Sequence, residues 1–100
     1  MAFVRVADES ELTVDSRKIV IVSGQEYALF NVSGTVYCID NACPHAGGPL
    51  GEGHVDSGAV SCPWHCWYFD IKTGEGLYGL GIGVGSYPCK VEDGAILIDI

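Results

Sequence analysis

The sequence predicts an all-β fold of short strands and tight turns, and two observations support this. The 100 residues include 14 glycines and 10% aromatic residues, a composition typical of short strands separated by turns. No segment shows the apolar periodicity of an amphipathic helix. Since the length is that of one ordinary domain, we expect residues 1–100 to form a single domain.

Strands are expected on both sides of a central insert. The runs rich in β-branched and aromatic residues are Phe3–Val6, Arg17–Val22, Tyr27–Val32, Thr35–Ile39, Tyr87–Val91 and Ala95–Ile100. Ser33-Gly34 and Asp93-Gly94 each separate two such runs, and both are expected to form two-residue hairpin turns in which glycine supplies a positive φ.

The insert, at about residues 41–76, has a different composition. It contains all three histidines, three of the four prolines and both tryptophans. Its many glycines and prolines interrupt regular structure, so we expect a loop-dominated subdomain carried on the β scaffold. Functional residues are often found on such loops.

The charge balance excludes some classes of partner. The formal net charge is −8, from 13 acidic and five basic side chains. This balance disfavours nucleic acid and anionic membrane surfaces as partners. No apolar run approaches the length of a membrane helix, and the first residues do not resemble a secretory signal, so a cytoplasmic location is expected.

Cysteine and histidine occur together in two short clusters, Cys43-Pro44-His45 and Cys62-Pro63-Trp64-His65. The five cysteines are odd in number, which favours metal binding over a disulfide framework. Each cluster offers one thiolate and one imidazole. Such a set suits zinc, although structural zinc sites usually pair Cys with Cys and His with His. It also suits two iron ions, each with one type of protein ligand.

Two segments, CPHAGGPL at 43–50 and CPWHCWYFD at 62–70, together with the Thr73-Gly74 turn, resemble a Rieske-type ferredoxin. The resemblance implies an antiparallel β-sandwich with an inserted cluster-binding subdomain. It implies one 2Fe–2S cluster per chain, with Cys43 and Cys62 on the inner iron. His45 and His65 would bind the outer iron, where the electron leaves.

The chain departs from the high-potential members of this family at four positions. Gly48 and Trp64 occupy the positions of two cysteines that form a disulfide in those relatives. Trp67 and Phe69 occupy the positions of a serine and a tyrosine whose hydroxyls lie near the cluster. Because hydrogen bonds to the sulfurs raise the reduction potential, we expect a potential near the low end of the Rieske range, about −150 mV.

The remaining candidates receive no ligand role. Cys38 and Cys89 lie in predicted strands and are expected to be buried as small apolar residues. Cys66 stands where the family usually has glycine, and we expect the backbone to tolerate it. His54 has no assigned role, and the glycine-rich segment 76–85 is expected to form a mobile cover over the cluster.

The resemblance implies a soluble, monomeric one-electron carrier and not an enzyme. Such a carrier receives electrons from a flavin-dependent reductase and passes them to a terminal oxygenase. The alternatives are the small subunit of a nicotinamide-dependent nitrite reductase and a zinc-stabilised interaction module. An oxygenase active site needs two histidines and a carboxylate on iron. Once His45 and His65 are assigned to the cluster, His54 is the one histidine that remains, so the chain is not expected to contain such a site.

Overall fold

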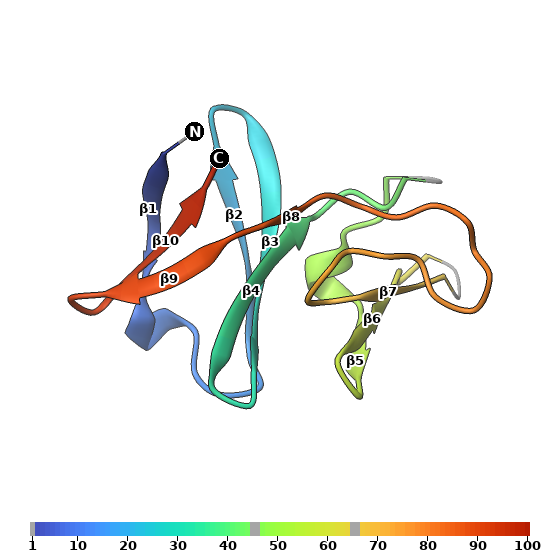
Figure 1. The fold of residues 1–100 in the computed structure, drawn as a ribbon, viewed down its shortest axis with the longest axis horizontal. Helices are drawn as coiled ribbons and strands as arrows, with labels where there is room; N and C mark the ends of the chain where they lie inside the picture. Colours follow the sequence, from blue (N-terminus) through green and yellow to red (C-terminus); the bar gives the residue numbers. More distant parts are fainter. Residues whose placement is uncertain (1, 45–46, 65–66) are drawn as a thin grey trace.

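The computed structural model of the protein describes residues 2–44, 47–64 and 67–100. Within them the only helical elements are two short 3-10 turns, η1 (Glu9–Glu11) and η2 (Leu50–Glu52). The strands form three antiparallel sheets (Figure 1), which confirms the all-β prediction. The first sheet has the strand order β1 (Phe3–Asp8), β10 (Ala95–Asp99), β9 (Cys89–Glu92). The middle sheet has the order β2 (Arg17–Val22), β3 (Gln25–Val32), β4 (Thr35–Asp40), β8 (Ser86–Tyr87). The third sheet, in the insert, has the order β5 (His54–Asp56), β6 (Ala59–Ser61), β7 (Tyr68–Asp70).

The middle sheet is buried on both faces. Side chains alternate across a strand, and along β3 the residues Tyr27 and Leu29 pack into one core while Ala28 and Phe30 pack into another. The first core also contains Ile96 of β10, so it lies between the first two sheets. The second contains residues of the third sheet and of the cysteine loops. The fold is therefore a sandwich with the insert packed against its outer face.

Two expected hairpin turns are present. Ser33 and Gly34 have φ values of 53° and 95°, and Asp93 and Gly94 have 52° and 76°. Two successive positive φ values match the twist of the flanking strands. Two further turns of this kind, at residues 23–24 and 57–58, join β2 to β3 and β5 to β6. The insert thus contains a small sheet that the sequence analysis did not predict, because its strands are only three residues long.

The expectation of one strand over Tyr87–Val91 is wrong. The run is divided at Pro88 into β8, which pairs with β4 in the middle sheet, and β9, which pairs with β10 in the first sheet. Proline has no N–H to donate to a ladder, and here it marks the point where the chain passes from one sheet to the other. The Pro88 carbonyl accepts a hydrogen bond from Asp99 N at 2.9 Å.

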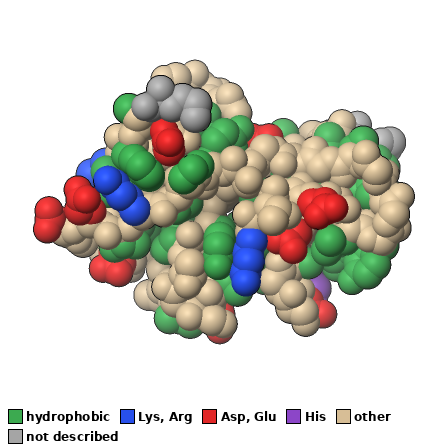
Figure 2. All heavy atoms as spheres, in the orientation of Figure 1, with side chains coloured by type: hydrophobic (Ala, Val, Ile, Leu, Met, Phe, Trp, Pro, Cys, Tyr) green, Lys and Arg blue, Asp and Glu red, His purple; other side chains and the backbone are tan. Residues whose placement is uncertain are grey.

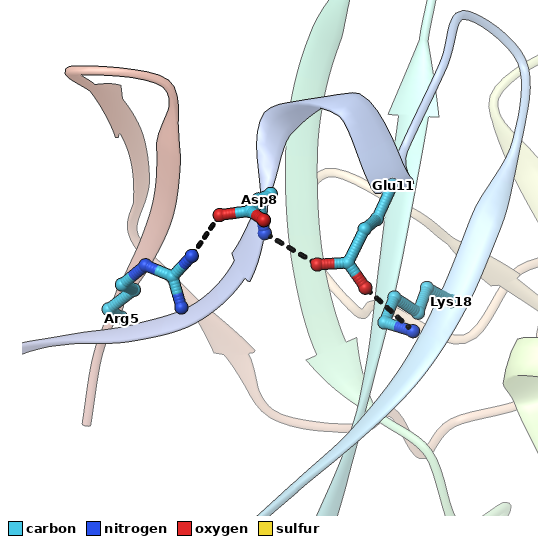
Figure 3. Close-up of polar contacts among 4 residues, drawn as sticks. All are labelled: Arg5, Asp8, Glu11 and Lys18. Atoms are coloured by element: carbon cyan, nitrogen blue, oxygen red, sulfur yellow. Dashed lines mark hydrogen bonds and ion pairs between the residues drawn. The ribbon is translucent and has the colours of Figure 1, made fainter.

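The link between β1 and β2 is fixed by a chain of polar contacts (Figure 3). Arg5 pairs with Asp8, whose backbone N–H donates to the Glu11 carboxylate at 2.8 Å. The other oxygen of Glu11 lies 3.3 Å from Lys18 Nζ. The hydrogen bond from Asp8 N–H, followed by the contact with Lys18, lowers the pKa of Glu11. Together these contacts close the η1 turn and orient β1 relative to β2.

Acidic side chains are spread over the face shown in Figure 2, whereas Lys and Arg occupy only a few places on it. This distribution agrees with the formal charge of −8. Among residues 2–44, 47–64 and 67–100, no helix is long and apolar enough to span a bilayer.

Candidate metal centre

The two predicted cysteine ligands lie in two loops of the same design. Cys43 N donates to Gly48 O, and Cys62 N donates to Trp67 O, each at 2.9 Å. In both loops, therefore, the cysteine amide bonds to the carbonyl five residues later. Both cysteines are almost fully buried, at 2% and 3% exposure, and both belong to the core beneath the outer face of the middle sheet.

The two loops meet at Gly48. A Cβ atom placed on Gly48 would lie 2.6 Å from Cys62 Sγ and about 3.1 Å from the Trp64 ring. In this chain, the absence of a side chain at position 48 lets the backbone of the first loop approach the second-loop thiol this closely. Gly48 and Trp64 therefore lie beside each other.

Asn41 holds the first loop in place and was not singled out by the sequence analysis. It is 1% exposed, and its side-chain oxygen accepts a hydrogen bond from Gly51 N at 2.8 Å. Its side-chain nitrogen donates to Glu26 at 2.9 Å, and its carbonyl accepts from Leu50 N at 2.7 Å. A buried asparagine with satisfied polar atoms fixes a loop to its scaffold. In a sequence it looks like any turn asparagine, so no local signal reveals this role.

The glycine-rich segment packs against the same core. Leu80 and Val84 pack against the buried cluster that includes both cysteines. The expectation that this segment is a mobile cover stays a prediction. A Cβ on Gly76 would lie 1.8 Å from Ile82 O, and one on Gly74 would lie 2.2 Å from Val84 O. The glycines therefore let the two arms of this segment pack backbone against backbone, a reason that the sequence analysis did not give.

Asp40 joins the start of the first loop to the end of the glycine-rich segment. Its carboxylate accepts hydrogen bonds from Gly85 N at 2.7 Å and from Tyr87 OH at 2.6 Å. Its own N–H donates to Gly85 O at 2.9 Å. Partial burial and then the bond to Asp40 raise the pKa of Tyr87 above its usual value, so its hydroxyl stays a donor. Here the two chain segments that connect the insert to the sandwich lie side by side.

Two of the four predicted ligands, His45 and His65, lie outside the described residues. Within the described ranges no group of three or more His, Cys, Asp or Glu side chains could hold a metal ion. The residues that are described fit a 2Fe–2S cluster: two loops of matching design place two buried cysteines in the same core, and the Cys62 thiol lies against Gly48 of the other loop. Burying thiolates in an apolar core requires a compensating positive charge, and iron ions would supply it.

A separate cleft of about 770 Å³ lies between the middle sheet and the β5–β6 hairpin. It is lined by His54 and Asp56 of the insert and by Arg17 and Phe30 of the sandwich, among others; of the cysteines that the structure describes, none lines it. Because electron transfer needs no substrate pocket, the cysteine loops remain the candidate site on chemical grounds.

Comparisons with known proteins agree with this site. Residues 2–79 match the model of the Rieske 2Fe–2S domain. The ferredoxin component of the naphthalene 1,2-dioxygenase system of Pseudomonas putida is 34% identical over 82 residues, which cover 81% of this chain and 79% of that protein.

Two solved structures have the same fold. The Sphingomonas yanoikuyae B1 ferredoxin superposes with a TM-score of 0.89 and 30% identity over 99% of both chains. A protein described as an NADH-dependent nitrite reductase small subunit from Mycobacterium tuberculosis has a TM-score of 0.86 over 97% of this chain and 93% of its own. At 24% identity it supports the fold alone.

These matches decide between the cofactors that the sequence left open, and they favour an iron–sulfur cluster over zinc. They also favour a ferredoxin component, which transfers electrons, over an enzyme with its own substrate. The chain belongs to the Rieske 2Fe–2S domain family and is a one-electron carrier with a 2Fe–2S cluster.

Proposed function

We propose that the cluster is bound by Cys43 and Cys62 on one iron and by His45 and His65 on the other. The cluster supplies the ability to accept and release one electron. The chain supplies the rest: the two buried thiols would hold one iron inside the core, away from solvent.

We further propose that the acceptor is the terminal component of an oxygenase system and that the donor is a flavin-dependent reductase. The observation that carries this proposal is the similarity to the dioxygenase ferredoxin component over 81% of the chain. The part of the molecule around the cysteine loops and the glycine-rich segment also exposes Trp64 and Tyr78, at 63% and 86%. Exposed aromatic side chains are enriched in protein interfaces. We expect a monomeric, cytoplasmic carrier that meets each partner in turn.

The test is reconstitution of electron flow. The protein is mixed with NADH, a flavin-dependent reductase and the oxygenase encoded beside its gene, and product formation is followed while the carrier concentration is varied. We expect turnover to depend on the carrier and to saturate. If the gene lies instead beside a sirohaem nitrite reductase, and only nitrite reduction depends on the protein, the oxygenase assignment is wrong.

The reduction potential is expected near −150 mV, at the low end of the Rieske range. Phe69 is fully buried in the core with the two cysteines and has no hydroxyl to donate to a sulfur. Gly48 and Trp64 leave the loops without the covalent link found in high-potential relatives. Protein-film voltammetry measures the value directly, and a clearly positive potential would contradict this explanation.

A further inference from the structure

Two cysteines outside the metal centre lie together at the base of the insert. Cys38 in β4 is 2% exposed, and Cys89 in β9 is partly exposed. Both side chains belong to the core between the first two sheets. Tyr87 is the register partner of Cys38 in the β4–β8 ladder, and Cys89 follows it by two residues on the neighbouring strand β9. From the sequence, both cysteines are expected only to pack as small apolar residues.

The two cysteines lie close enough to influence each other. The Cys38 thiol donates to Ile39 O at 4.0 Å and the Cys89 thiol to Tyr87 O at 3.5 Å. Contact with Cys89, and then burial, raises the pKa of Cys38, and contact with Cys38 lowers the pKa of Cys89. The partly exposed member of the pair is thus the more acidic one. Cys89 is the more accessible of the two thiols, so an oxidant reaches it first, and Cys38 is the buried neighbour that can resolve it.

We propose that Cys38 and Cys89 are a redox-modification site, which hydrogen peroxide converts into a reversible disulfide between the two sheets of the sandwich. The Cys89 thiolate attacks peroxide, giving a sulfenic acid and hydroxide. The Cys38 thiol then attacks that sulfur, forming the S–S bond and releasing water. In total, two thiols lose two hydrogens and two electrons, and one peroxide becomes two waters.

The position of the pair gives the disulfide a structural effect. Residues 39–88 contain the insert, the glycine-rich segment and all four predicted cluster ligands. A Cys38–Cys89 bond would close this stretch into a covalent loop where its two ends leave the sandwich. There Asp40 already accepts hydrogen bonds from Gly85 and Tyr87. Cross-links that close long loops restrict the unfolded chain most. The oxidised protein should therefore lose its cluster more slowly than the reduced protein.

Peptide mapping tests the bond itself. The holoprotein is treated anaerobically with a small excess of hydrogen peroxide, unfolded in the presence of an alkylating agent and cleaved with endoproteinase Asp-N. Cleavage before each aspartate places Cys38 in peptide 15–39, Cys43 in 40–55, Cys62 and Cys66 in 56–69, and Cys89 in 70–92. We expect peptides 15–39 and 70–92 to be joined, with the loss of two hydrogen masses, and to separate on reduction. A link from either peptide to 40–55 or 56–69, or two fully alkylated peptides, would overturn the proposal.

Two variants separate the roles of the thiols. In Cys89→Ala, which changes a partly exposed side chain, we expect peptide 15–39 to remain fully alkylated after peroxide. In Cys38→Ala, we expect Cys89 to stop at the sulfenic acid, which dimedone traps. Cluster release in urea, followed by visible absorption, should be at least about tenfold slower in the oxidised wild type than in the reduced one. Equal release rates would contradict the proposal that the disulfide slows loss of the cluster.

Discussion

Replacing Cys62 with alanine should abolish cluster binding, with iron falling below about one-tenth of the wild-type content. The Cys62 thiol is 3% exposed and lies against the backbone of Gly48 in the other loop. Loss of an outer-shell partner alone costs a metal site about 10–100-fold in affinity, so loss of a ligand should cost more. Iron analysis and visible absorption of the purified variant measure the effect.

Cys38→Ala is the matched control, because Cys38 is equally buried, at 2%, but packs in the other core. We expect this variant to keep its full iron content and spectrum, with a modest loss of stability from the small cavity. If both variants bind iron normally, Cys62 is not a ligand. If both lose it, the loss reports unfolding and not ligation.

Gly53→Ala should destabilise the protein by about 3 kcal/mol and lower its Tm by more than about 10 °C. Gly53 follows the η2 turn, and a Cβ there would lie 1.9 Å from Ser61 O, on the strand that leads into Cys62. Its φ of −75° suits any residue, so backbone conformation does not explain the glycine. The Gly53 carbonyl also accepts a hydrogen bond from Arg17, which ties this point to the middle sheet. Thermal unfolding followed by circular dichroism gives the shift.

The sign of this change is informative. An alanine with room at such a position would stabilise the protein by about 0.4–1 kcal/mol, through the unfolded state. Gly24→Ala gives the comparison: it has nothing within 4 Å of the added Cβ but a φ of +83°, so it should cost only about 1 kcal/mol. A Tm for Gly53→Ala at or above that of the wild type would show that the close contact with Ser61 is not a constraint.

Much of the sandwich is predictable from the sequence, because its strands are long enough to show a pattern. β2 has the expected bounds, and the turns at Ser33-Gly34 and Asp93-Gly94 occur where glycine follows a residue that tolerates positive φ. The small sheet of the insert escaped prediction because three-residue strands carry no periodicity. The strand break at Pro88 arises because the residues before it pair with β4 and the residues after it pair with β10. Since β4 lies far away in the sequence, no local pattern predicts the break.

The sequence proposes ligands for the metal centre, but it does not reveal the residues that hold the ligand loops in place. Cys43 and Cys62 stand in a recognisable pattern, and the structure brings their two loops together at Gly48. The roles of Asn41 and Asp40 depend on partners far along the chain, at Glu26 and at Gly85. No local spacing marks such contacts. The assignment of Cys43, His45, Cys62 and His65 as ligands stays a prediction.

Nitrogen coupling in the reduced cluster tests the central claim most directly. The protein is produced with 15N-labelled histidine, reduced with dithionite and examined by electron–nuclear double resonance. We predict coupling of the unpaired electron to two histidine nitrogens, lost one at a time in His45→Cys and His65→Cys. A reduced cluster without histidine nitrogen coupling would contradict the assignment of Cys43, His45, Cys62 and His65 as the ligand set.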